Sequence, residues 1–425
     1  MLTFMKVRTN KRSADHQVHL EKIAMKQAVV ITGATGFLGS HLALQLLKEM
    51  REHTIICVAR GKGPASARDR VVQALQKAEA DCGGRGVEDL CRRVAIIDSD
   101  LFGDDYHVDI AALEILSGLF VSSFWHCAAS IKFMDSQHSS VWNTNVTGLT
   151  NALQLAAALK THVFNHVSTA YVSGTRCGRI PESTDFVPSA FNNVYEESKY
   201  HGELLVREEC ARVGIKYRIV RPSIIIGHSE TYRTSSNAGF YQWVDALRQL
   251  CNKVTARDAQ YFERVPLRVK LNRNATLNLI PVDIVVAEML ALEKHGESTV
   301  GQVFHLTSES PVSLNDVLRT VAHVLNISSV EIADGDAELG TIDRLFNKQV
   351  RVFAPYLTQR KVFDRTNVAR YGVDTHQMNY LLDMERVRKF ARSYLDSFAA
   401  TGGADTGMET PVYTGQHSSG EVAAA

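Results

Sequence analysis

Short apolar runs rich in β-branched residues alternate with longer helical patterns over the first half of the chain. The runs lack the alternation of apolar and polar residues that is typical of a strand with one solvent-exposed face. Both of their faces are therefore expected to be buried. The pattern predicts strands at 28–32, 54–59, 94–97, 119–125, 162–168 and 217–226, and helices at 38–49, 67–79 and 194–213. Strands and helices in alternation predict an α/β fold built on a doubly wound parallel sheet.

This rhythm changes after residue 227. Residues 228–274 are polar and aromatic, with a helix predicted near 240–250. Further helices are predicted at 282–294, 313–325 and 384–398, and one more sheet strand at 303–307. We therefore expect a first domain over 27–227 whose sheet is completed by about 278–307, and a smaller, discontinuous, mostly helical second domain over 228–277 and 308–399.

The two ends of the chain are predicted to lie outside these domains. Residues 1–26 carry basic side chains but no apolar stretch of signal-peptide length, so we interpret them as a poorly ordered extension, with Met25 as an alternative start to Met1. Residues 400–425 are rich in Gly, Thr, Ser and Ala and are expected to form a disordered tail. No transmembrane segment is expected, and the basic N-terminus leaves open only a weak contact with a membrane surface.

Charge and cysteine content exclude several classes of protein. The 425 residues include 47 basic and 46 acidic side chains, so the chain lacks the basic excess of a nucleic-acid-binding protein. Its 7 cysteines are scattered without a Cys-x-x-Cys motif, which argues against a disulfide framework and a zinc site and fits a reducing, cytoplasmic location. His162 and His166 lack the Glu and the helix of a zinc protease, and Cys127 lies in an apolar run typical of packing rather than of a nucleophile.

A glycine-rich turn, TGATGFLG, lies directly between a predicted strand and a predicted helix. Phosphates need backbone N–H donors at close range, a positive helix end and no Cβ in the way, and glycines at such a turn supply all three. The motif therefore predicts that the first domain is a Rossmann domain that binds a dinucleotide. The predicted contacts are Gly33, Thr35, Gly36, Phe37, Leu38 and Gly39.

The end of the second predicted strand indicates which dinucleotide is bound. An acidic residue there would favour NAD, whereas this chain has Arg60 and no carboxylate nearby, which favours the 2′-phosphate of NADP(H). Asp100 and Leu101 follow the third strand, where an adenine contact is expected, and Ala128 and Ala129 end the fourth, where small residues let a cofactor approach. A solvated arginine, a turn aspartate and simple packing are the alternative interpretations.

Tyr195 and Lys199 are the candidate catalytic pair. Their spacing of four on a predicted helix puts both side chains on one face, and an ammonium group beside a phenol would lower the pKa of the phenol. The same spacing also arises by chance in a surface tyrosine above a solvated lysine. The order of motifs favours catalysis, because Ser168 and Thr169 end the preceding strand at the sheet edge where such folds bind ligands.

Together these residues resemble the extended short-chain dehydrogenase/reductase superfamily, and within it the fatty acyl-CoA reductase and thioester-reductase branch with its male-sterility-type NAD-binding domain. The likeness covers about 28–227 and is carried by TGATGFLGSHL, ICVAR, FWHCAASIKF, NTNVTGLTNAL, FNHVSTAYVSG, YEESKYHGELLV and IVRPSIIIG. A later segment, FAPYLTQRKVFDRTN (353–367), is reminiscent of acyl-CoA reductases.

The resemblance implies a role for individual residues. Thr169 would orient the substrate, Tyr195 would be the acid, and Lys199 would activate it and contact the cofactor ribose, with Asn145 supporting the lysine through a water relay. The implied cofactor contacts besides the glycine turn are Tyr195 and Lys199, Arg60 and Arg70 at the 2′-phosphate, and Pro222, Ser223 and Ile224 beside the nicotinamide.

The resemblance further implies an NADPH-dependent reductase, in lipid metabolism, that converts an acyl-CoA or carrier-protein thioester to an aldehyde or alcohol. The second domain would then bind the substrate, and the aromatic stripe Phe240, Tyr241, Trp243, Val244 and Leu247 would line an acyl tunnel or, as we slightly favour, form ordinary core. The alternatives are an NADP-dependent dehydrogenase or reductase of a small carbonyl or secondary alcohol, such as a sterol or secondary metabolite, and a non-catalytic NADP-binding protein. Neither the acyl chain length nor a homodimer is decided by the sequence.

Overall fold

The computed structural model of the chain describes residues 27–103, 106, 113, 116, 118–371 and 380–400. The predicted N-terminal extension and residues 401–425 of the predicted tail lie outside these described residues. Within the described ranges, no helix combines the length and the apolar character that a membrane crossing requires.

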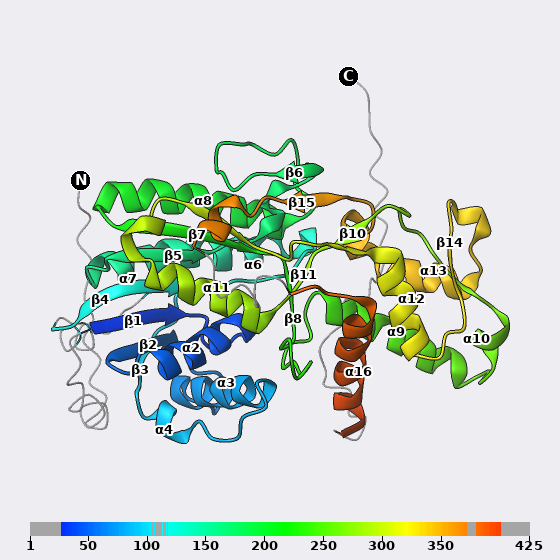
Figure 1. Ribbon diagram of the computed structural model, residues 1–425, viewed down its shortest axis with the longest axis horizontal. Coiled ribbons are helices and arrows are strands. Elements are labelled where there is room, and N and C mark those ends of the chain that lie inside the picture. Colours follow the sequence, from blue (N-terminus) through cyan, green and yellow to red (C-terminus); the bar gives the residue numbers. More distant parts are fainter. Residues whose placement is uncertain are drawn as a thin grey trace.

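A seven-stranded parallel sheet forms the core of the part of the molecule drawn on the left in Figure 1. Its strand order is β12-β7-β5-β4-β1-β2-β3. The strands are β1 (Gln27–Thr32), β2 (His53–Ala59), β3 (Val94–Asp98), β4 (Phe120–His126), β5 (Val163–Val167), β7 (Lys216–Pro222) and β12 (Val303–Leu306). Because the order runs outwards in both directions from β1 and β4, the prediction of a doubly wound sheet is confirmed, and the crevice at the carboxyl ends of these two strands is where such sheets bind ligands.

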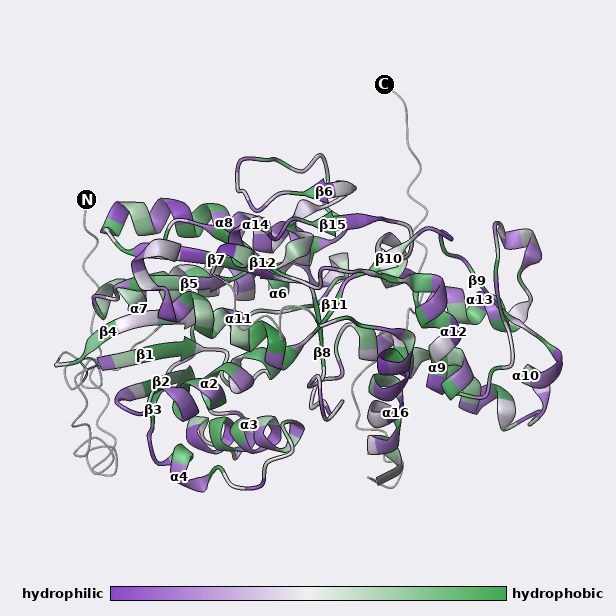
Figure 2. Cartoon of the chain, viewed as in Figure 1, coloured by the Kyte–Doolittle hydropathy of each residue, from purple (hydrophilic) through white to green (hydrophobic). Residues whose placement is uncertain are grey.

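Helices cover both faces of the sheet, namely α2 (Phe37–Glu49), α3 (Ala67–Asp81) and α11 (Val282–Lys294) on one face and α7 (Gly148–Ala158) and α8 (Val194–Val213) on the other. Val29 and Ile31 of β1 pack in the cluster that holds α2, α3 and α11, whereas Ala28 and Val30 pack with α7 and α8. Consecutive side chains of β1 thus point to opposite faces, and both faces are buried. Figure 2 shows β1 as hydrophobic along most of its length, in contrast to the mixed surfaces of α3 and α8.

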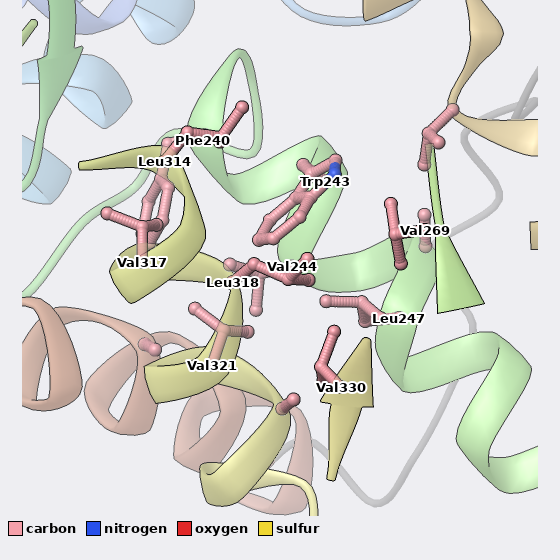
Figure 3. Packing of buried hydrophobic residues seen from close by; sticks show 14 of the residues in the cluster. Phe240, Trp243, Val244, Leu247, Val269, Leu314, Val317, Leu318, Val321 and Val330 are labelled. Carbon is pink, nitrogen blue, oxygen red and sulfur yellow. The ribbon is translucent and has the colours of Figure 1, made fainter. Parts of the chain in front are cut away.

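A separate hydrophobic cluster lies beyond the carboxyl ends of the strands, on the side towards which the arrowhead of β1 points in Figure 1. Its helices are α9 (Phe240–Thr255), α12 (Leu314–Val324), α13 (Thr341–Gln349) and α16 (Met384–Ala400). Figure 3 shows Val244 of α9 lying against Leu318 and Val321 of α12. The helices predicted at 240–250, 313–325 and 384–398 are therefore present, whereas α13 was not predicted. The division into two domains at the boundaries given above remains our proposal.

One predicted strand is interrupted. The run 217–226 was expected to be continuous, but the structure ends β7 at Pro222 and continues as β8 (Ile224–Ile226), which pairs with β11 (Leu279–Pro281) outside the main sheet. Pro222 has no backbone N–H, so it cannot donate a hydrogen bond to a neighbouring strand. The next two backbone N–H groups bond to residues other than those of β5: Ser223 N donates to Leu306 O, and Ile224 N donates to Asn278 O. The chain thereby turns out of the sheet at the edge of the crevice.

The remaining elements are short. They include the paired strands β9 (Leu267–Val269) with β14 (Val330–Ile332), β10 (Thr276–Leu277) with β13 (Val312–Ser313), and β6 (Gly178–Ile180) with β15 (Lys361–Phe363). The short helices are α4 (Glu88–Cys91), α6 (His138–Trp142), α10 (Tyr261–Arg264) and α14 (Thr366–Arg370). A π-helical turn, η2 (Asn143–Thr147), joins α6 to α7, and 3-10 turns lie at η1 (Asp135–Gln137), η3 (Ala170–Ser173), η4 (Gly296–Thr299), η5 (Asp336–Glu338) and η6 (Arg351–Leu357).

Candidate active site

The glycine turn joins β1 to α2 at the sheet crevice. Gly33 has a φ of +76, and a Cβ on it would lie 2.6 Å from Ala128 N, so both its conformation and its surroundings require glycine. A Cβ on Gly39 would lie 2.2 Å from Gly33 O, so α2 approaches the turn more closely than any side chain allows. Helix α2 begins at Phe37 behind Gly36, with no side chain capping its first N–H groups. Bare donors at a helix N-terminus fit the pyrophosphate of a dinucleotide.

A cavity of about 370 Å³ opens beside this turn, where the carboxyl ends of β5 and β7 meet α9 and α12. Twelve of the residues proposed from the sequence line it: Gly33, Gly36, Phe37, Leu38, Gly39, Ala129, Thr169, Tyr195, Lys199, Pro222, Ser223 and Ile224. The predicted cofactor turn and the predicted catalytic side chains therefore share one cavity. The proposed residues outside its lining are Thr35, Arg60, Arg70, Asp100, Leu101, Ala128 and Asn145.

Thr169 and Tyr195, the predicted substrate-orienting residue and the predicted acid, both line this cavity. Thr169 caps the turn η3 directly after β5, and its Oγ1 accepts a hydrogen bond of 3.3 Å from Tyr171 N. Tyr195 is in the first turn of α8, a start that Asn193 fixes by accepting a bond of 3.0 Å from Glu196 N. Burial raises the pKa of Tyr195 to about 12, a hydrogen bond with Thr169 lowers it, and the Glu196 carboxylate raises it. The tyrosine is accordingly a protonated donor at neutral pH.

Lys199 lies one turn after Tyr195 and is buried, with its Nζ donating to Val167 O at 2.5 Å. Burial lowers the pKa of Lys199 to about 8, although the Glu203 carboxylate raises it. The expectation that Lys199 lowers the pKa of Tyr195 is wrong for this structure, because the ammonium is directed at a backbone carbonyl and the desolvation of the phenol dominates. The burial of Lys199 and the partial burial of Tyr195 could not be predicted from their spacing.

The lysine leads to a stability prediction. Its pKa of about 8 in the folded chain lies below the ordinary 10.5, so a folding cost is present below pH 8 and disappears as the pH rises towards 10. Lys199→Met removes this cost and should raise the free energy of unfolding at pH 7 by roughly 2 kcal/mol, after allowance for the lost hydrogen bond to Val167. Denaturant unfolding at pH 7 and pH 10 tests this; a gain that does not shrink with pH would contradict it.

Asn145 does not contact Lys199 through its side chain. It sits in the π-helical turn η2, where its Oδ1 accepts from Ser130 N at 2.7 Å and its Nδ2 donates to Ser130 O and Ser198 Oγ, both at 2.9 Å. Asn145 therefore ties the loop after β4 to the catalytic helix α8. Its implied role in a water relay remains a prediction.

The residues proposed for the adenosine end lie at a second, open hollow. Arg60 is more than half exposed and forms an ion pair with Asp100, and Arg70 Nη1 donates to Arg60 O at 2.5 Å. The hollow at the ends of β2 and β3 is lined by Arg60, Gly61, Lys62, Arg70, Asp98, Ser99 and Asp100. The expectation that no carboxylate lies near Arg60 is wrong, because the end of β3 brings Asp98 and Asp100 into the hollow. The three cationic side chains still outnumber these two carboxylates, which suits a phosphate group. Leu101, by contrast, is 3 % exposed and packs in the hydrophobic cluster of α7 and α8.

Several aromatic residues of the cavity were not predicted from the sequence. Phe133, Tyr171, Phe353 and Tyr356 all line it, and the ring centroids of Phe133 and Tyr195 are 5.8 Å apart. Phe353 and Tyr356 belong to the later segment 353–367 whose likeness to acyl-CoA reductases was noted above, so that likeness was the available signal. In the stripe of α9, Phe240 and Trp243 line the cavity, whereas Tyr241, Val244 and Leu247 lie in the core alone. All five residues belong to the core cluster, and a role for Phe240 and Trp243 in an acyl tunnel remains a prediction.

Three further side chains that the sequence singled out are His162, His166 and Cys127. His166 is buried, with its ring 5.8 Å from that of His126, and burial lowers the pKa of both, whereas His162 pairs with Glu297 at the surface. Cys127 is partly buried and lines the cavity, and desolvation raises the pKa of its thiol to about 12, which disfavours the thiolate. Its role as a packing residue remains a prediction. In the described part of the chain, no three His, Cys, Asp or Glu side chains are grouped so that they could hold a metal ion.

Comparison with known sequences identifies the family. Residues 31–289 match the model of the male sterility protein family. Fatty acyl-CoA reductase 2 of Homo sapiens is 26% identical over 317 residues, which are 66% of this chain and 58% of that protein. From Aspergillus flavus, the nonribosomal peptide synthetase asaC is 27% identical over 301 residues (68% and 27% of the two chains), and the aldehyde reductase lnaA is 25% identical over 400 residues (86% and 36%). The chain thus spans between 27% and 58% of the length of these relatives.

Solved structures support the same conclusion at the level of the fold. The terminal R domain from the myxalamid PKS-NRPS biosynthetic pathway superimposes with a TM-score of 0.67 at 20% identity, covering 89% of this chain and 92% of that one. UDP-glucuronic acid 4-epimerase from Bacillus cereus in complex with NAD superimposes with a TM-score of 0.58 at 17% identity, covering 87% and 96%. The chain therefore belongs to the male sterility protein family and has the fold of an extended short-chain dehydrogenase/reductase.

Proposed function

We propose that this protein is an NADPH-dependent reductase of acyl thioesters, bound to coenzyme A or to a carrier protein, with an aldehyde or alcohol as product. The observation that carries the proposal is the single cavity in which the glycine turn, Thr169 and Tyr195 face a largely apolar space. That space suits an acyl group. Relatives named fatty acyl-CoA reductase and nonribosomal peptide synthetase add weight to the thioester as substrate.

The residues of the cavity would divide the work as follows. The turn from Gly33 to Gly39 would hold the cofactor pyrophosphate, and Lys199 would reach its ribose. NADPH, when bound, would supply the hydride for the thioester carbon. Thr169 and Tyr195 would donate hydrogen bonds to the thioester oxygen as it gains negative charge, and fixed donors in a dry site stabilise such charge strongly. Because the pKa of Tyr195 is raised to about 12, its hydroxyl stays protonated at neutral pH and could transfer the proton to the substrate oxygen once that oxygen carries negative charge.

A second candidate function has one specific observation in its favour. The relative named aldehyde reductase, lnaA, aligns with 86% of this chain, including parts beyond the family match. An enzyme that reduces a free carbonyl would use Thr169 and Tyr195 in the same way. The two candidates differ only in whether a thiol leaves.

The test follows NADPH absorbance with the purified chain and acyl-CoA thioesters of short to long chains, beside the matching free aldehydes and ketones. We expect NADPH consumption with thioesters and a chain-length optimum set by the cavity of about 370 Å³. Consumption with free carbonyls alone would favour the second candidate. Cofactor binding without any turnover would support the non-catalytic alternative.

A further prediction concerns the choice of cofactor. Arg60→Ala should weaken NADPH binding about 10- to 100-fold, because a charge-assisted hydrogen bond to the 2′-phosphate is worth about 1.5–3 kcal/mol. NADH binding should change little. The matched control is Arg68→Ala on the same side of the sheet, since Arg68 donates to the carbonyls of Cys91 and Val94 rather than facing the hollow. Fluorescence titration of the parent and both variants with each cofactor measures the six affinities, and an equal loss for NADH and NADPH in Arg60→Ala would contradict the assignment of Arg60.

A further inference from the structure

The turn η6 lies against the catalytic helix although it follows Tyr195 by more than 150 residues. Phe353 and Tyr356 of this turn line the cavity. The ring of Phe133 bridges them to the proposed acid, because its centroid lies 5.8 Å from that of Tyr195, 5.9 Å from that of Tyr356 and 6.1 Å from that of Phe353. Tyr356 also lies edge-on to Tyr171, at 5.1 Å, two residues beyond Thr169. The turn therefore forms one wall of the cavity close to the proposed acid.

Buried polar groups hold this wall at the start of α8. Tyr356 OH donates to Glu196 Oε1 at 2.7 Å and accepts from Asn193 Nδ2 at 2.9 Å. Glu196 has no exposed surface, and its Oε2 accepts from both nitrogens of Asn192, at 3.0 Å and 2.9 Å. Because the phenolic hydrogen is already donated to a carboxylate, Tyr356 cannot act as the acid. Its aromatic ring, rather than its hydroxyl, is the part of Tyr356 that can contact a ligand in the cavity.

A second anchor holds the same segment on the other side. Lys361 of β15 is 5 % exposed, and its Nζ donates to Gly174 O at 2.6 Å and to Arg176 O, in the loop that follows η3. Burial lowers the pKa of Lys361, and the Glu196 carboxylate opposes this lowering. The segment is thus fixed both to the helix of Tyr195 and to the loop after Thr169. Breaking a buried hydrogen bond to a charged group is costly, so the wall cannot yield easily to a bulky ligand.

We infer that Tyr356 is a specificity-determining residue whose ring limits branching of the acyl group close to the reacting carbonyl, and that Glu196 is its positioning residue. The inference rests on the proposed function, since it places the acyl group in the cavity that Tyr195, Phe133 and Tyr356 line together. It assigns to the second half of the chain a share in substrate choice close to the proposed acid, beside the apolar lining that α9 and α12 contribute.

The test compares kcat/KM for two thioesters of equal carbon count, octanoyl-CoA and 2-ethylhexanoyl-CoA. Tyr356→Ala should raise the branched-to-linear ratio about tenfold or more, as expected when a hydrophobic pocket gains room for a few carbons. Tyr356→Phe keeps the ring and should change the ratio less than about threefold. Glu196→Ala should move the ratio towards that of Tyr356→Ala. Glu196→Gln keeps an acceptor for Tyr356 OH but turns an NH2 group towards the two donors of Asn192, so it should restore the parent ratio only in part. An unchanged ratio in Tyr356→Ala would overturn the inference.

A binding measurement separates this inference from the proposed function. The thioethers S-octyl-CoA and S-(2-ethylhexyl)-CoA cannot be reduced, so their dissociation constants report the shape of the cavity alone. If the parent reduces no thioester, the proposed function fails, and the ratio of the two dissociation constants in Tyr356→Ala and parent still decides the role of Tyr356. If Tyr356→Ala does not fold, Tyr356→Leu takes its place in both measurements. Equal ratios in parent and variant would overturn the inference there as well.

Discussion

Tyr195→Phe is expected to lower kcat for thioester reduction by at least about a thousandfold, because the substitution removes both a proton donor and a hydrogen-bond donor to the developing oxyanion. The hydroxyl is fixed by the start of α8 and by its hydrogen bond with Thr169. The affinity for NADPH should stay within about threefold of the parent value, because the glycine turn and Lys199 are untouched. Steady-state kinetics and cofactor titration on the same preparation measure both.

Tyr200→Phe is the matched control for this prediction. Tyr200 lies on the same helix, and its ring packs against Phe191 and His201, outside the cavity lining. Its loss of a hydroxyl should leave kcat within about twofold. A Tyr195→Phe variant that keeps a tenth or more of the parent kcat would show that the acid lies elsewhere.

Gly39→Ala is expected to have the largest effect on the cofactor site. A methyl group on Gly39 would lie 2.2 Å from Gly33 O and 2.7 Å from Gly33 C, and both are backbone atoms that cannot rotate away. Helix α2 would have to move off the turn, at a cost of about 3 kcal/mol in the free energy of unfolding. The first N–H groups of α2 would move with it, so NADPH affinity should fall at least about tenfold. Denaturant unfolding and cofactor titration measure the two effects.

Gly86→Ala provides the comparison, because a Cβ there would meet only Glu88 Oε2, at an ordinary 3.7 Å. Its free energy of unfolding should stay within about 0.5 kcal/mol of the parent value. If Gly39→Ala behaved like Gly86→Ala in both stability and NADPH affinity, the close approach of α2 to the turn would not be needed for cofactor binding.

The sequence predicted correctly those helices and strands whose ends and faces are determined by residues close together in the chain. Helix α8 was predicted at 194–213 and occurs over the same residues, because Asn193 caps its first turn and Gly214, with a φ of +75, ends it in the left-handed conformation. The doubly wound sheet followed from apolar runs without alternation, since strands buried on both faces need no polar side. The cofactor turn, Thr169, Tyr195 and Lys199 were found for a similar reason, as short motifs placed at strand ends.

Other features depend on partners distant in sequence. The break after Pro222 is set by Leu306 and Asn278, which accept the next two backbone hydrogen bonds from over 50 residues away. The position of Tyr356 beside Tyr195 likewise depends on the pairing of β15 with β6 and on the bond to Glu196. The raised pKa of Tyr195 comes from burial, which spacing along a helix does not encode. Tertiary packing therefore decided what short-range patterns could not.

The measurement that tests the central claim most directly is the release of free thiol during NADPH oxidation. With an acyl-CoA, each hydride that reduces the thioester carbon must be followed by loss of the thiol, which a thiol-reactive dye detects. We predict one thiol per NADPH oxidised if the product is an aldehyde, or one per two if it is reduced on to the alcohol, and neither signal in Tyr195→Phe. NADPH oxidation without thiol release, or no oxidation with any thioester, would contradict thioester reduction.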